Sequence, residues 1–514
     1  MLRRNSRSTE RKQRRTFHFE SLELRAMMSA STNSVFNAPL APAAGPTMSP
    51  MITAAQLGKA ITPLAPATTT GPFNPLQIRQ IYGFDKLSLN GAGTTIAIVD
   101  AYNDPTIAQD LATFDTEFSL PYAQLTIHKT TTTNNAKWDL ETALDVEWAH
   151  AIAPAANILL VEASSDSTDD LMTAVNYARN ASGVSVVSMS FGAPEFERSW
   201  NPGSWSDENQ TDYDSGTFVT PQGHQSVSFV SSAGDVGSRV IYPSTSPNVL
   251  AVGGTVITAS EATKVAASSV PNNWQSMSYD VESAWSDGGG GFSGVESRPA
   301  YQNGFNANSM RSTPDVAYGA AGFWVFDSNN GDWNSVSGTS AGAPQWAGII
   351  ALANQERAQL GGDTLSNTVA DIYQLPSSDF HDITTGSTGL YSAKVGFDQT
   401  TGRGTPIANL LVNDLAHSEW LPPPVKPIGP GTGIGINPTQ PVNAMVATVT
   451  PTTTTPTPTT TPTKPTTTST TMKANIANVV ASPFVSPTMH AARPTTLHAS
   501  DAADQLFEAM FGFE

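Results

Sequence analysis

The chain has 514 residues, enough for one large domain with tails or for two domains. Its formal net charge is −18, and residues 26–514 alone carry about −23, because eight of the 26 basic residues lie within the first 25 positions. So acidic a surface argues against nucleic acid as a partner. The absence of cysteine excludes a thiol nucleophile, a thiolate metal site and disulfides.

The first 30 residues are basic at their start and lack the apolar core of a signal peptide. Residues 17–30 (FHFESLELRAMMSA) resemble a tag found at the start of many bacterial extracellular proteins, with Leu24 where that tag has proline. We therefore expect an export or sorting segment over residues 1–30 and a secreted or cell-surface protein. Residues 31–74 are rich in Ala, Pro, Thr and Ser and are predicted to be a disordered linker or vestigial propeptide. No apolar run reaches about 18 residues, so no transmembrane span is expected.

Apolar runs and helix-like stretches alternate through the middle of the chain. The runs have the length and composition of buried strands, and the stretches between them have the length and apolar spacing of helices. Strands are predicted at residues 94–100, 157–162, 184–190, 226–232 and 249–253, and helices at 106–118, 140–153 and 168–179. This alternation predicts an α/β fold whose mostly parallel central sheet has helices on both faces. Such folds bind ligands at the carboxyl ends of the strands.

One predicted helix carries a pair of carboxylates. Glu141 and Asp145 are four residues apart, so both side chains lie on one helical face, next to the apolar residues Leu144 and Trp148. Two neighbouring carboxyl groups in a partly dry site share a proton, which raises one pKa. Taken alone, the same spacing also fits an ordinary acidic face exposed to water.

Residues 337–348 (SGTSAGAPQWAG) form the most distinctive segment. Its small residues allow a tight turn, and an apolar helix over residues 347–357 is predicted to follow. Ser340 would then sit at a helix N-terminus, where amide N–H groups and the helix dipole favour developing negative charge. Taken alone, Ser340 could also be an N-cap before a buried helix. Asp235, in the segment 232–237 (SAGDVG), has the sequence context of a turn residue.

A serine nucleophile needs a neighbouring base to take its proton. Asp100 ends a predicted strand, as the aspartate of a subtilisin does, but none of the eight histidines lies in the sequence context that a subtilisin requires. His128 lies in a predicted strand, and we expect His150 at the surface or at the C-terminal end of its helix. The pair Glu141 and Asp145 offers an alternative base.

Together these segments resemble the sedolisin family, the serine-carboxyl peptidases of the subtilisin-like clan. The resemblance covers residues 75–416 and includes the Glu-x-x-x-Asp helix with the Ala-Pro-x-Ala run after it, the Ser-Ala-Gly-Asp-x-Gly motif, the Gly-Thr-Ser motif, and residues 284–285 (AW), 290–293 (GGFS) and 298–302 (RPAYQ). It implies that Ser340 attacks the peptide carbonyl and that Glu141 takes its proton and later gives it to the leaving amine. Asp145 would orient Glu141, and protonated Asp235 would donate to the oxyanion.

The resemblance therefore implies an endopeptidase that works through an acyl-enzyme at acidic pH on protein and peptide substrates, and we expect a monomer. Two later segments, residues 380–386 (FHDITTG) and 393–406 (AKVGFDQTTGRGTP), resemble calcium loops of the same family. Carboxylates and backbone carbonyls suit this hard cation. The correspondence implies one structural Ca²⁺ held by the side chains of Asp382 and Asp398 and the carbonyls of Ile383, Lys394 and Gly396. Acidic turns without a metal are the alternative.

We predict a peptidase domain over residues 75–418, a Pro/Thr-rich disordered spacer over 419–498, and a short helix or tail over 499–514. Members of the family usually carry a long folded propeptide, which residues 31–74 do not resemble, and Phe191 stands where some members have tryptophan near the specificity pocket. A catalytically inactive surface or adhesion protein with the same fold is one alternative. A calcium-dependent subtilisin that uses Asp100 is another.

Overall fold

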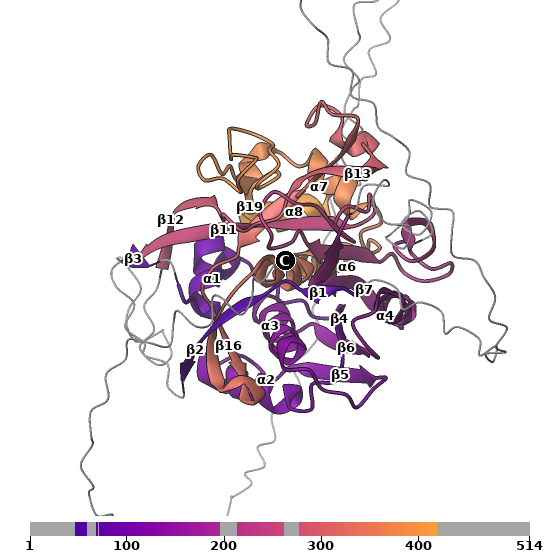
Figure 1. Cartoon of the computed structure of the whole chain (residues 1–514), viewed down its shortest axis with the longest axis vertical. Helices are drawn as coiled ribbons and strands as arrows, with labels where there is room; N and C mark the ends of the chain where they lie inside the picture. Colours follow the sequence, from indigo (N-terminus) through magenta and orange to yellow (C-terminus); the bar gives the residue numbers. More distant parts are fainter. Residues whose placement is uncertain (1–46, 59–67, 70, 196–212, 262–276, 419–514) are drawn as a thin grey trace, which may run out of the picture. The chain divides into compact units, whose positions relative to one another are not determined.

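A nine-stranded sheet forms the centre of the fold in this computed structural model, which describes residues 47–58, 68–69, 71–195, 213–261 and 277–418. Along the sheet the order is β12-β11-β9-β7-β4-β6-β5, and β3 and β15 also pair with β11. Figure 1 labels β12, β11, β7, β4, β6 and β5 of this sheet. The strands are β3 (Thr68–Thr69), β4 (Thr95–Ala101), β5 (Gln124–Lys129), β6 (Asn157–Ala163), β7 (Val184–Met189), β9 (Ser228–Ser232), β11 (Leu250–Glu261), β12 (Met277–Ala284) and β15 (Val316–Gly319). Within this sheet β5, β6, β4, β7, β9 and β11 pair in parallel in that spatial order, and β15 also pairs in parallel with β11. Only β3 and β12 run antiparallel to β11, so the predicted mostly parallel sheet is confirmed.

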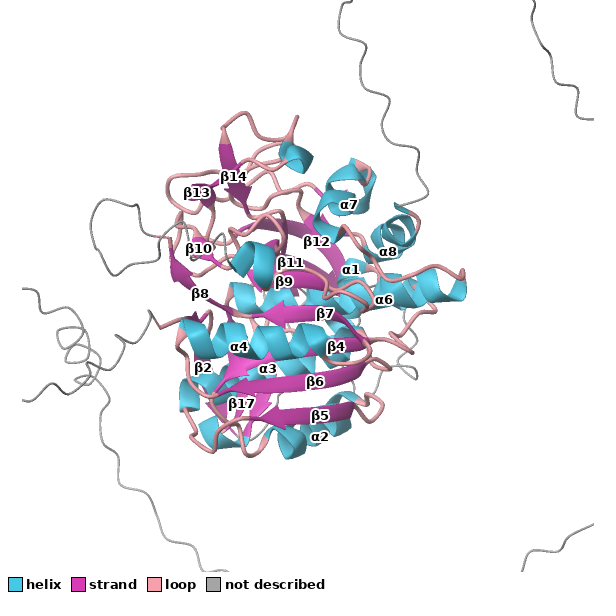
Figure 2. Ribbon diagram, turned by 90° about the vertical axis from the view of Figure 1, so that its right-hand side faces the viewer, coloured by secondary structure: helices cyan, strands magenta, loops and turns pink. Residues whose placement is uncertain are grey.

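Helices cover both faces of this sheet, as the sequence predicted. They are α1 (Pro75–Tyr82), α2 (Ile107–Phe118), α3 (Ala136–Ile152), α4 (Thr168–Asn180), α6 (Gly342–Gln359), α7 (Thr368–Gln374) and α8 (Ala408–Ala416). Figure 2 shows the parallel strands β7, β4, β6 and β5 in this spatial order, with helices packed on them. The helices predicted at residues 106–118, 140–153 and 168–179 correspond to α2, α3 and α4, and α3 begins four residues earlier than expected because Asn135 caps it.

Two hydrophobic cores lie on the two faces of the sheet. In β4, Ile96 and Ile98 belong to the core that contains α3 and α6, whereas Ala97 and Val99 belong to the core that contains α4. This alternation follows from the two-residue period of side chains along a strand. Because both faces are buried, the central strands are apolar throughout, which is the pattern that made them recognisable in the sequence.

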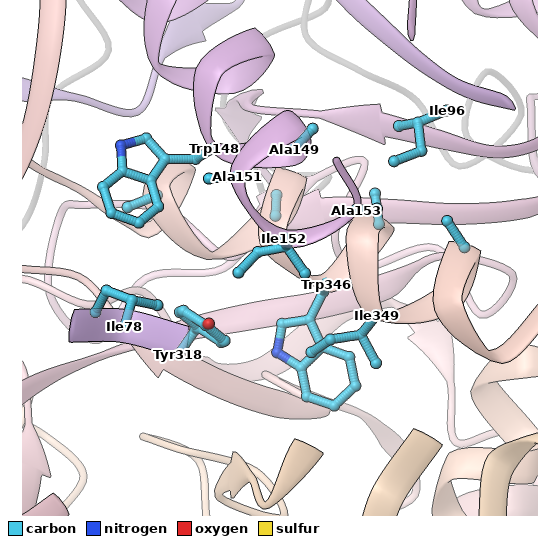
Figure 3. Packing of buried hydrophobic residues seen from close by; sticks show 14 of the residues in the cluster. Ile78, Ile96, Trp148, Ala149, Ala151, Ile152, Ala153, Tyr318, Trp346 and Ile349 are labelled. Carbon is cyan, nitrogen blue, oxygen red and sulfur yellow. The ribbon is translucent and has the colours of Figure 1, made fainter. Parts of the chain in front are cut away.

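The helices α3 and α6 pack closely against each other within the larger core (Figure 3). A side chain at Gly348 of α6 would place its Cβ 2.7 Å from a methyl carbon of Ile152 in α3, so glycine is required for this approach. The buried indoles of Trp148 and Trp346 keep hydrogen bonds to the carbonyls of Trp324 and Ala317 at 2.9 and 3.1 Å. This packing fixes α3 relative to the start of α6.

Shorter strands lie outside the central sheet. They are β1 (Ser49–Pro50), β2 (Thr53–Gly58), β8 (Phe191–Pro194), β10 (Ile241–Tyr242), β13 (Gly291–Ser297), β14 (Met310–Thr313), β16 (Phe323–Asp327), β17 (Asp332–Ser337), β18 (Phe380–His381) and β19 (Thr405–Pro406). The prediction that order begins near Pro75 needs correction. Residues 49–50 pair with β8 and residues 53–58 pair with β17, because both strands offer a free edge to the chain.

The ends of the chain lie largely outside the described residues. The predicted export segment over 1–30, the spacer over 419–498 and the tail over 499–514 are all in this part, and their structure stays a prediction. Among the residues that are described, no helix is long and apolar enough to cross a membrane.

Candidate active site

Three carboxyl groups meet beside the end of β4. Glu141 and Asp145 of α3 and Asp100 of β4 are all fully buried. One Asp145 oxygen accepts a hydrogen bond from the Ser190 hydroxyl at 2.8 Å. In the described part of the chain, the other Asp145 oxygen and both oxygens of Asp100 and Glu141 have no partner with hydrogen-bond geometry. The predicted acidic pair is therefore buried, not an exposed helical face.

Burial is the main cause of the abnormal protonation of these groups, because it removes water from the charged form. It raises the pKa of Glu141 and of Asp145 well above their ordinary values, and the neighbouring negative charges raise both pKa values further. Burial likewise raises the pKa of Asp100 to about 8. Ser190 and Ser340 act in the opposite direction, since their hydroxyls favour the ionised forms of Asp145 and Glu141. The cluster therefore holds shared protons at acidic and neutral pH.

Ser340 lies in a short 3₁₀ turn, Thr339–Ala341, which leads directly into α6. It is fully buried, and its hydroxyl contacts the Ser190 carbonyl oxygen at 3.4 Å while lying near enough to Glu141 to influence its pKa. Gly342 must be small, because a Cβ there would lie 2.7 Å from Val252. The turn thus places the hydroxyl between the carboxyl cluster and the amide groups at the N-terminus of α6.

Asp235 approaches the same turn from the loop after β9. One of its oxygens accepts hydrogen bonds from the Thr339 amide at 2.9 Å and the Thr339 hydroxyl at 2.8 Å. The other oxygen has no partner among the described residues. Burial raises the pKa of Asp235 to about 7, although the Thr339 hydrogen bonds act to lower it. Below that pH the carboxyl group is protonated and its free oxygen can donate.

The described histidines lie away from this cluster. His128, in β5 as expected, stacks on Tyr177, with ring centroids 3.5 Å apart. The prediction of a surface position for His150 is wrong, because it is fully buried at the end of α3 and contacts an Asp115 oxygen at 3.3 Å. His381 stacks on Tyr279, and the two remaining described histidines, His224 and His417, are at least partly exposed. None of these five hydrogen bonds to Ser340, which leaves Glu141 as its ionisable neighbour.

Known proteins resemble this chain in sequence and in fold. A family model described as the subtilase family matches residues 129–379. Kumamolisin from Bacillus sp. (strain MN-32) is 31% identical over 388 residues, which cover 67% of this chain and 64% of kumamolisin. Physarolisin from Physarum polycephalum is 29% identical over 414 residues, 69% of this chain and 70% of physarolisin. The chain thus spans less than two thirds of kumamolisin.

A solved structure of Pseudomonas sedolisin, a serine-carboxyl proteinase, aligns with 67% of this chain and 98% of its own, with a TM-score of 0.57 and 24% identity. The chain belongs to the sedolisin family. The fold of this sedolisin-family chain is accordingly subtilisin-like, and its Glu141, Asp145, Asp235 and Ser340 lie around one turn, the start of α6.

Two loops of this sedolisin-family chain contain the residues expected to bind calcium. The Gly396 amide contacts both Asp382 oxygens at 3.1 and 3.0 Å, and the Lys394 amide donates to Asp398 at 2.9 Å. Both carboxylates therefore face the loop from Lys394 to Asp398, and Ile383 is buried beside it. The donor set is two carboxylates plus carbonyls, which is chemically suited to Ca²⁺. Within the described residues no group of three or more His, Cys, Asp or Glu side chains is placed to hold a metal.

Some residues around the site were not identified from the sequence as functional. Ser190, which contacts both Asp145 and Ser340, follows β7 at its carboxyl end. Asp100, considered only for a subtilisin, lies against the carboxyl pair instead. The rule that sites form at the carboxyl ends of parallel strands could have selected both positions. The strands β1 and β2 had no such signal.

Proposed function

We propose that this protein is a serine-carboxyl endopeptidase that hydrolyses peptide bonds in proteins and peptides through an acyl-enzyme. The single observation that carries the proposal is a buried serine at a helix N-terminus next to a buried carboxyl pair, in a chain of the sedolisin family. A serine hydroxyl needs a base within reach to take its proton, and the pair is such a base. Burial raises the pKa of its carboxyl groups, a shift that is common at catalytic sites.

In the proposed mechanism Ser340 adds to the peptide carbonyl while Glu141 takes its proton and then passes it to the leaving amine. Asp145, held by the Ser190 hydroxyl, orients Glu141 and shares its proton. Asp235 donates from its free oxygen to the oxyanion, supported by the Thr339 hydrogen bonds to its other oxygen. Water then hydrolyses the ester by the same steps in reverse order.

Acidic pH is part of the proposal. Asp235 donates only while protonated, so activity is lost as pH rises through its pKa of about 7. An ionised Asp235 would place a negative charge beside the developing oxyanion, where it repels that charge. The proposed enzyme therefore works below neutral pH.

The test is hydrolysis of a denatured protein at about pH 4, where carboxyl groups such as Asp235 are protonated. Wild type should cleave it, and Ser340→Ala should lose at least about 10³-fold in kcat/KM because the nucleophile is absent. Ser182→Ala, which changes an exposed serine beyond α4, is the matched control and should retain full activity. A wild type that is inert at every pH would instead favour the inactive surface protein.

We also propose that one Ca²⁺ binds between the loops of Asp382 and Asp398, where it would neutralise two carboxylates and tie the loops together. Removal of calcium with a chelator should lower Tm, and Ca²⁺ should restore it better than Mg²⁺. Asp382→Asn should reduce that calcium-dependent shift, whereas Asp363→Asn, at an exposed position after α6, should not. No calcium dependence of Tm in wild type would contradict the site.

Export to the outside of the cell is proposed from the first 30 residues, which lie outside the described part of the chain. Fractionation of expressing cells checks it. The full chain should be found in the medium or at the cell surface, and a chain that lacks residues 2–30 should stay inside.

A further inference from the structure

The chain between the two candidate calcium loops, residues 386–393, forms a tight hairpin. Near its tip the Thr388 amide donates to the Tyr391 carbonyl at 3.0 Å. At its base the Ala393 amide donates to the Gly386 carbonyl at 3.1 Å. Both bonds join the two arms, so the hairpin is closed at its tip and at its base.

The base and one arm of this hairpin are anchored on neighbouring strands. The Ala284 amide of β12 donates to the Thr385 carbonyl at 2.8 Å, and Ala284 also pairs with Gly386. A Cβ on Gly386, whose φ is +94°, would lie 2.6 Å from the Ala284 amide nitrogen, so glycine is required there. The ring of Tyr391 packs edge-on against Phe292 of β13, with centroids 6.0 Å apart. These contacts fix the direction in which the hairpin projects.

The tip of the hairpin is bound to the loop that follows Asp235. Ser238 makes this connection, because its amide and its hydroxyl both donate to the Thr388 carbonyl, at 3.0 and 2.5 Å. The Ser238 hydroxyl oxygen in turn accepts from the Leu390 amide at 2.8 Å. One serine side chain therefore joins both sides of the hairpin tip to the loop of the proposed oxyanion donor.

This tip lies within reach of a bound substrate. Ser238 is three residues after Asp235, and three residues span at most about 11 Å. The loop between them is also held by Gly237, whose amide donates to the Asp287 carbonyl at 2.7 Å. An extended peptide advances about 3.3 Å per residue. The hairpin tip is therefore within about three substrate residues of the cleaved bond.

Two large apolar side chains are exposed here. Val236, directly after Asp235, is 52% exposed, and Leu390, at the hairpin tip, is 83% exposed. A single exposed apolar side chain is ordinary on a protein surface. In this case the Ser238 hydrogen bonds hold the backbone of both loops, so the two side chains are presented to solvent in a fixed position. Apolar groups that are pre-organised in this way bind a partner at low entropic cost.

We propose that Val236 and Leu390 form an apolar rim of the substrate cleft, which binds an apolar side chain of the substrate within about three residues of the cleaved bond. Ser238 is the positioning residue of this rim, because it joins the loop of Asp235 to the hairpin tip. The proposal rests on the peptidase function proposed above and names its substrate class, which is peptide segments with an apolar residue at this position.

The rim acts on substrate binding and not on the chemical step. It contacts a part of the substrate that does not react, so the contact is equally strong before and during attack by Ser340. Uniform binding of this kind lowers KM without raising kcat. Because the contact stays partly open to water, its loss should cost about fivefold, which is below the effect of about 10–200-fold for one methylene in an enclosed pocket.

The experiment uses peptides of one sequence, with leucine or serine placed in turn at each of the three positions before and after one cleaved bond. For wild type at about pH 4, leucine should lower KM by at least about fivefold at one of these positions. Leu390→Ser should lose that preference, to within about twofold, and keep the preferences at the other positions. Val236→Ser should weaken the preference at the same position. If both variants keep every preference of wild type, the rim is wrong.

Leu360→Ser is the matched control. Leu360 is also exposed, by 47%, but it follows the last residue of α6, whose 18 residues place it about 27 Å from the Ser340 turn at the other end. This variant should keep the leucine preference of wild type at every position. A loss as large as that of Leu390→Ser would mean that removal of any exposed leucine has this effect, and the proposal would be wrong.

Ser238→Ala tests the positioning role. It leaves Leu390 in the chain but removes the hydroxyl that donates to Thr388 and accepts from the Leu390 amide, so the leucine preference at the rim position should fall as it does in Leu390→Ser. Ser238→Thr keeps a hydroxyl and should retain the preference within about twofold. A lower Tm for Ser238→Ala with an unchanged preference would mean that Ser238 only stabilises the fold, which overturns its positioning role.

The same peptides separate this proposal from the function on which it rests. If wild type and Leu390→Ser both cleave them with the same preferences, the rim is wrong and the peptidase function stands. If wild type cleaves neither these peptides nor an added denatured protein, the peptidase function fails, and the rim fails with it.

Discussion

Two buried pairs in this protein have the same four-residue spacing and opposite characters. Arg311 and Asp315 are a cation and an anion at 2.8 Å, whereas Glu141 and Asp145 are two acids. All four side chains are fully buried. The first pair joins opposite charges, and of its atoms only Arg311 Nε is without a partner among the described residues. The second pair brings two acids together and leaves three of their four oxygens without partners there, so the comparison separates a structural polar cluster from a reactive one.

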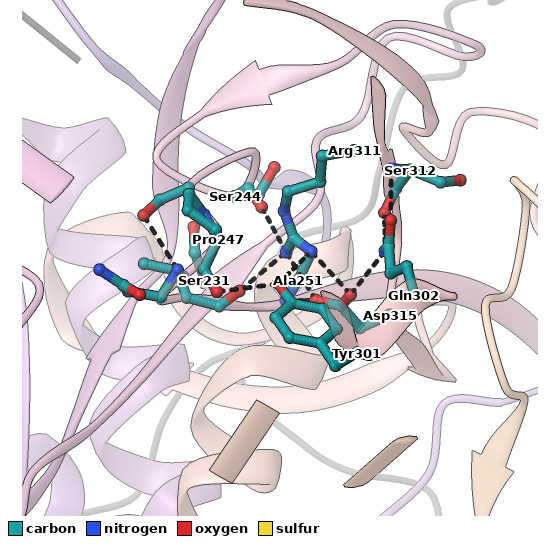
Figure 4. Close-up of polar contacts among 12 residues, drawn as sticks. Ser231, Ser244, Pro247, Ala251, Tyr301, Gln302, Arg311, Ser312 and Asp315 are labelled. Carbon is teal, nitrogen blue, oxygen red and sulfur yellow. Dashed lines mark hydrogen bonds and ion pairs between the residues drawn. The ribbon is translucent and has the colours of Figure 1, made fainter. Parts of the chain in front are cut away.

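The Arg311–Asp315 pair is the centre of a dense hydrogen-bond network (Figure 4). Arg311 also donates to the Tyr301 hydroxyl at 2.7 Å and to the Val249 carbonyl at 2.9 Å. Asp315 accepts from the Ala251 amide at 2.9 Å, besides a tyrosine hydroxyl. These contacts join the loop before β15 to β11. The network thus fixes the position of the loop before β15 relative to β11.

Uncompensated burial of acids costs folding free energy, so the carboxyl cluster is expected to be retained for its chemistry. This interpretation makes opposite predictions for the two pairs. Neutralising an acid of the cluster should reduce activity without loss of stability. Breaking the Arg311–Asp315 ion pair should instead lower the free energy of unfolding.

The largest expected effect is that of Glu141→Gln on activity. The amide cannot take the Ser340 proton, so kcat/KM on a denatured protein should fall by about 10⁴-fold at acidic pH. The free energy of unfolding should stay the same or rise, because a buried ionisable group is removed. Glu147→Gln changes another buried glutamate of α3, one that accepts from the Phe326 amide, and should keep activity within about threefold of wild type. Equal losses in both variants would contradict the assignment of the base.

Arg311→Met is expected to have the next largest effect. It leaves Asp315 buried without its cation, so the free energy of unfolding measured in urea should fall by roughly 3–5 kcal/mol. The double variant Arg311→Met/Asp315→Leu removes both charges and should recover part of that loss. If the double variant is no more stable than the single one, the unpaired charge is not the cause.

The pH dependence of stability should sharpen the comparison further. Burial raises the pKa of Asp104 to about 6, of Asp139 and Glu162 to about 7, and of Asp100 to about 8. The folded state therefore holds these protons more tightly than the unfolded state does. Their stabilising contribution is complete below about pH 4 and is lost as pH rises through about 6–8, by more than about 3 kcal/mol in total. Urea unfolding of Ser340→Ala at several pH values, which avoids self-digestion, measures it. Constant stability from pH 4 to pH 8 would contradict the raised pKa values.

Sequence patterns predicted the parts of the fold that depend on local periodicity. The strands predicted at 94–100 and 157–162 differ from β4 and β6 by one residue at most, because a strand buried on both faces is apolar throughout. The positions of β1 and β2 could not be predicted, because their pairing depends on distant edges of β8 and β17 and their own residues are mostly small and polar. The burial of His150 could not be predicted either, because its contact Asp115 lies in a different helix, α2.

Asp235→Asn is expected to have the smallest effect and tests the pH limit of the site. An amide donates at every pH, so the fall in activity toward neutral pH should shift upward from about 7, while activity at acidic pH changes by about tenfold or less. The amide must turn its oxygen toward the Thr339 amide and hydroxyl to keep those hydrogen bonds, which leaves its NH₂ aimed at the oxyanion position. A pH–rate profile of kcat/KM on a peptide substrate measures the shift. If the limb near pH 7 stays in place, a different group, such as the carboxyl cluster of Asp100, Glu141 and Asp145, sets it.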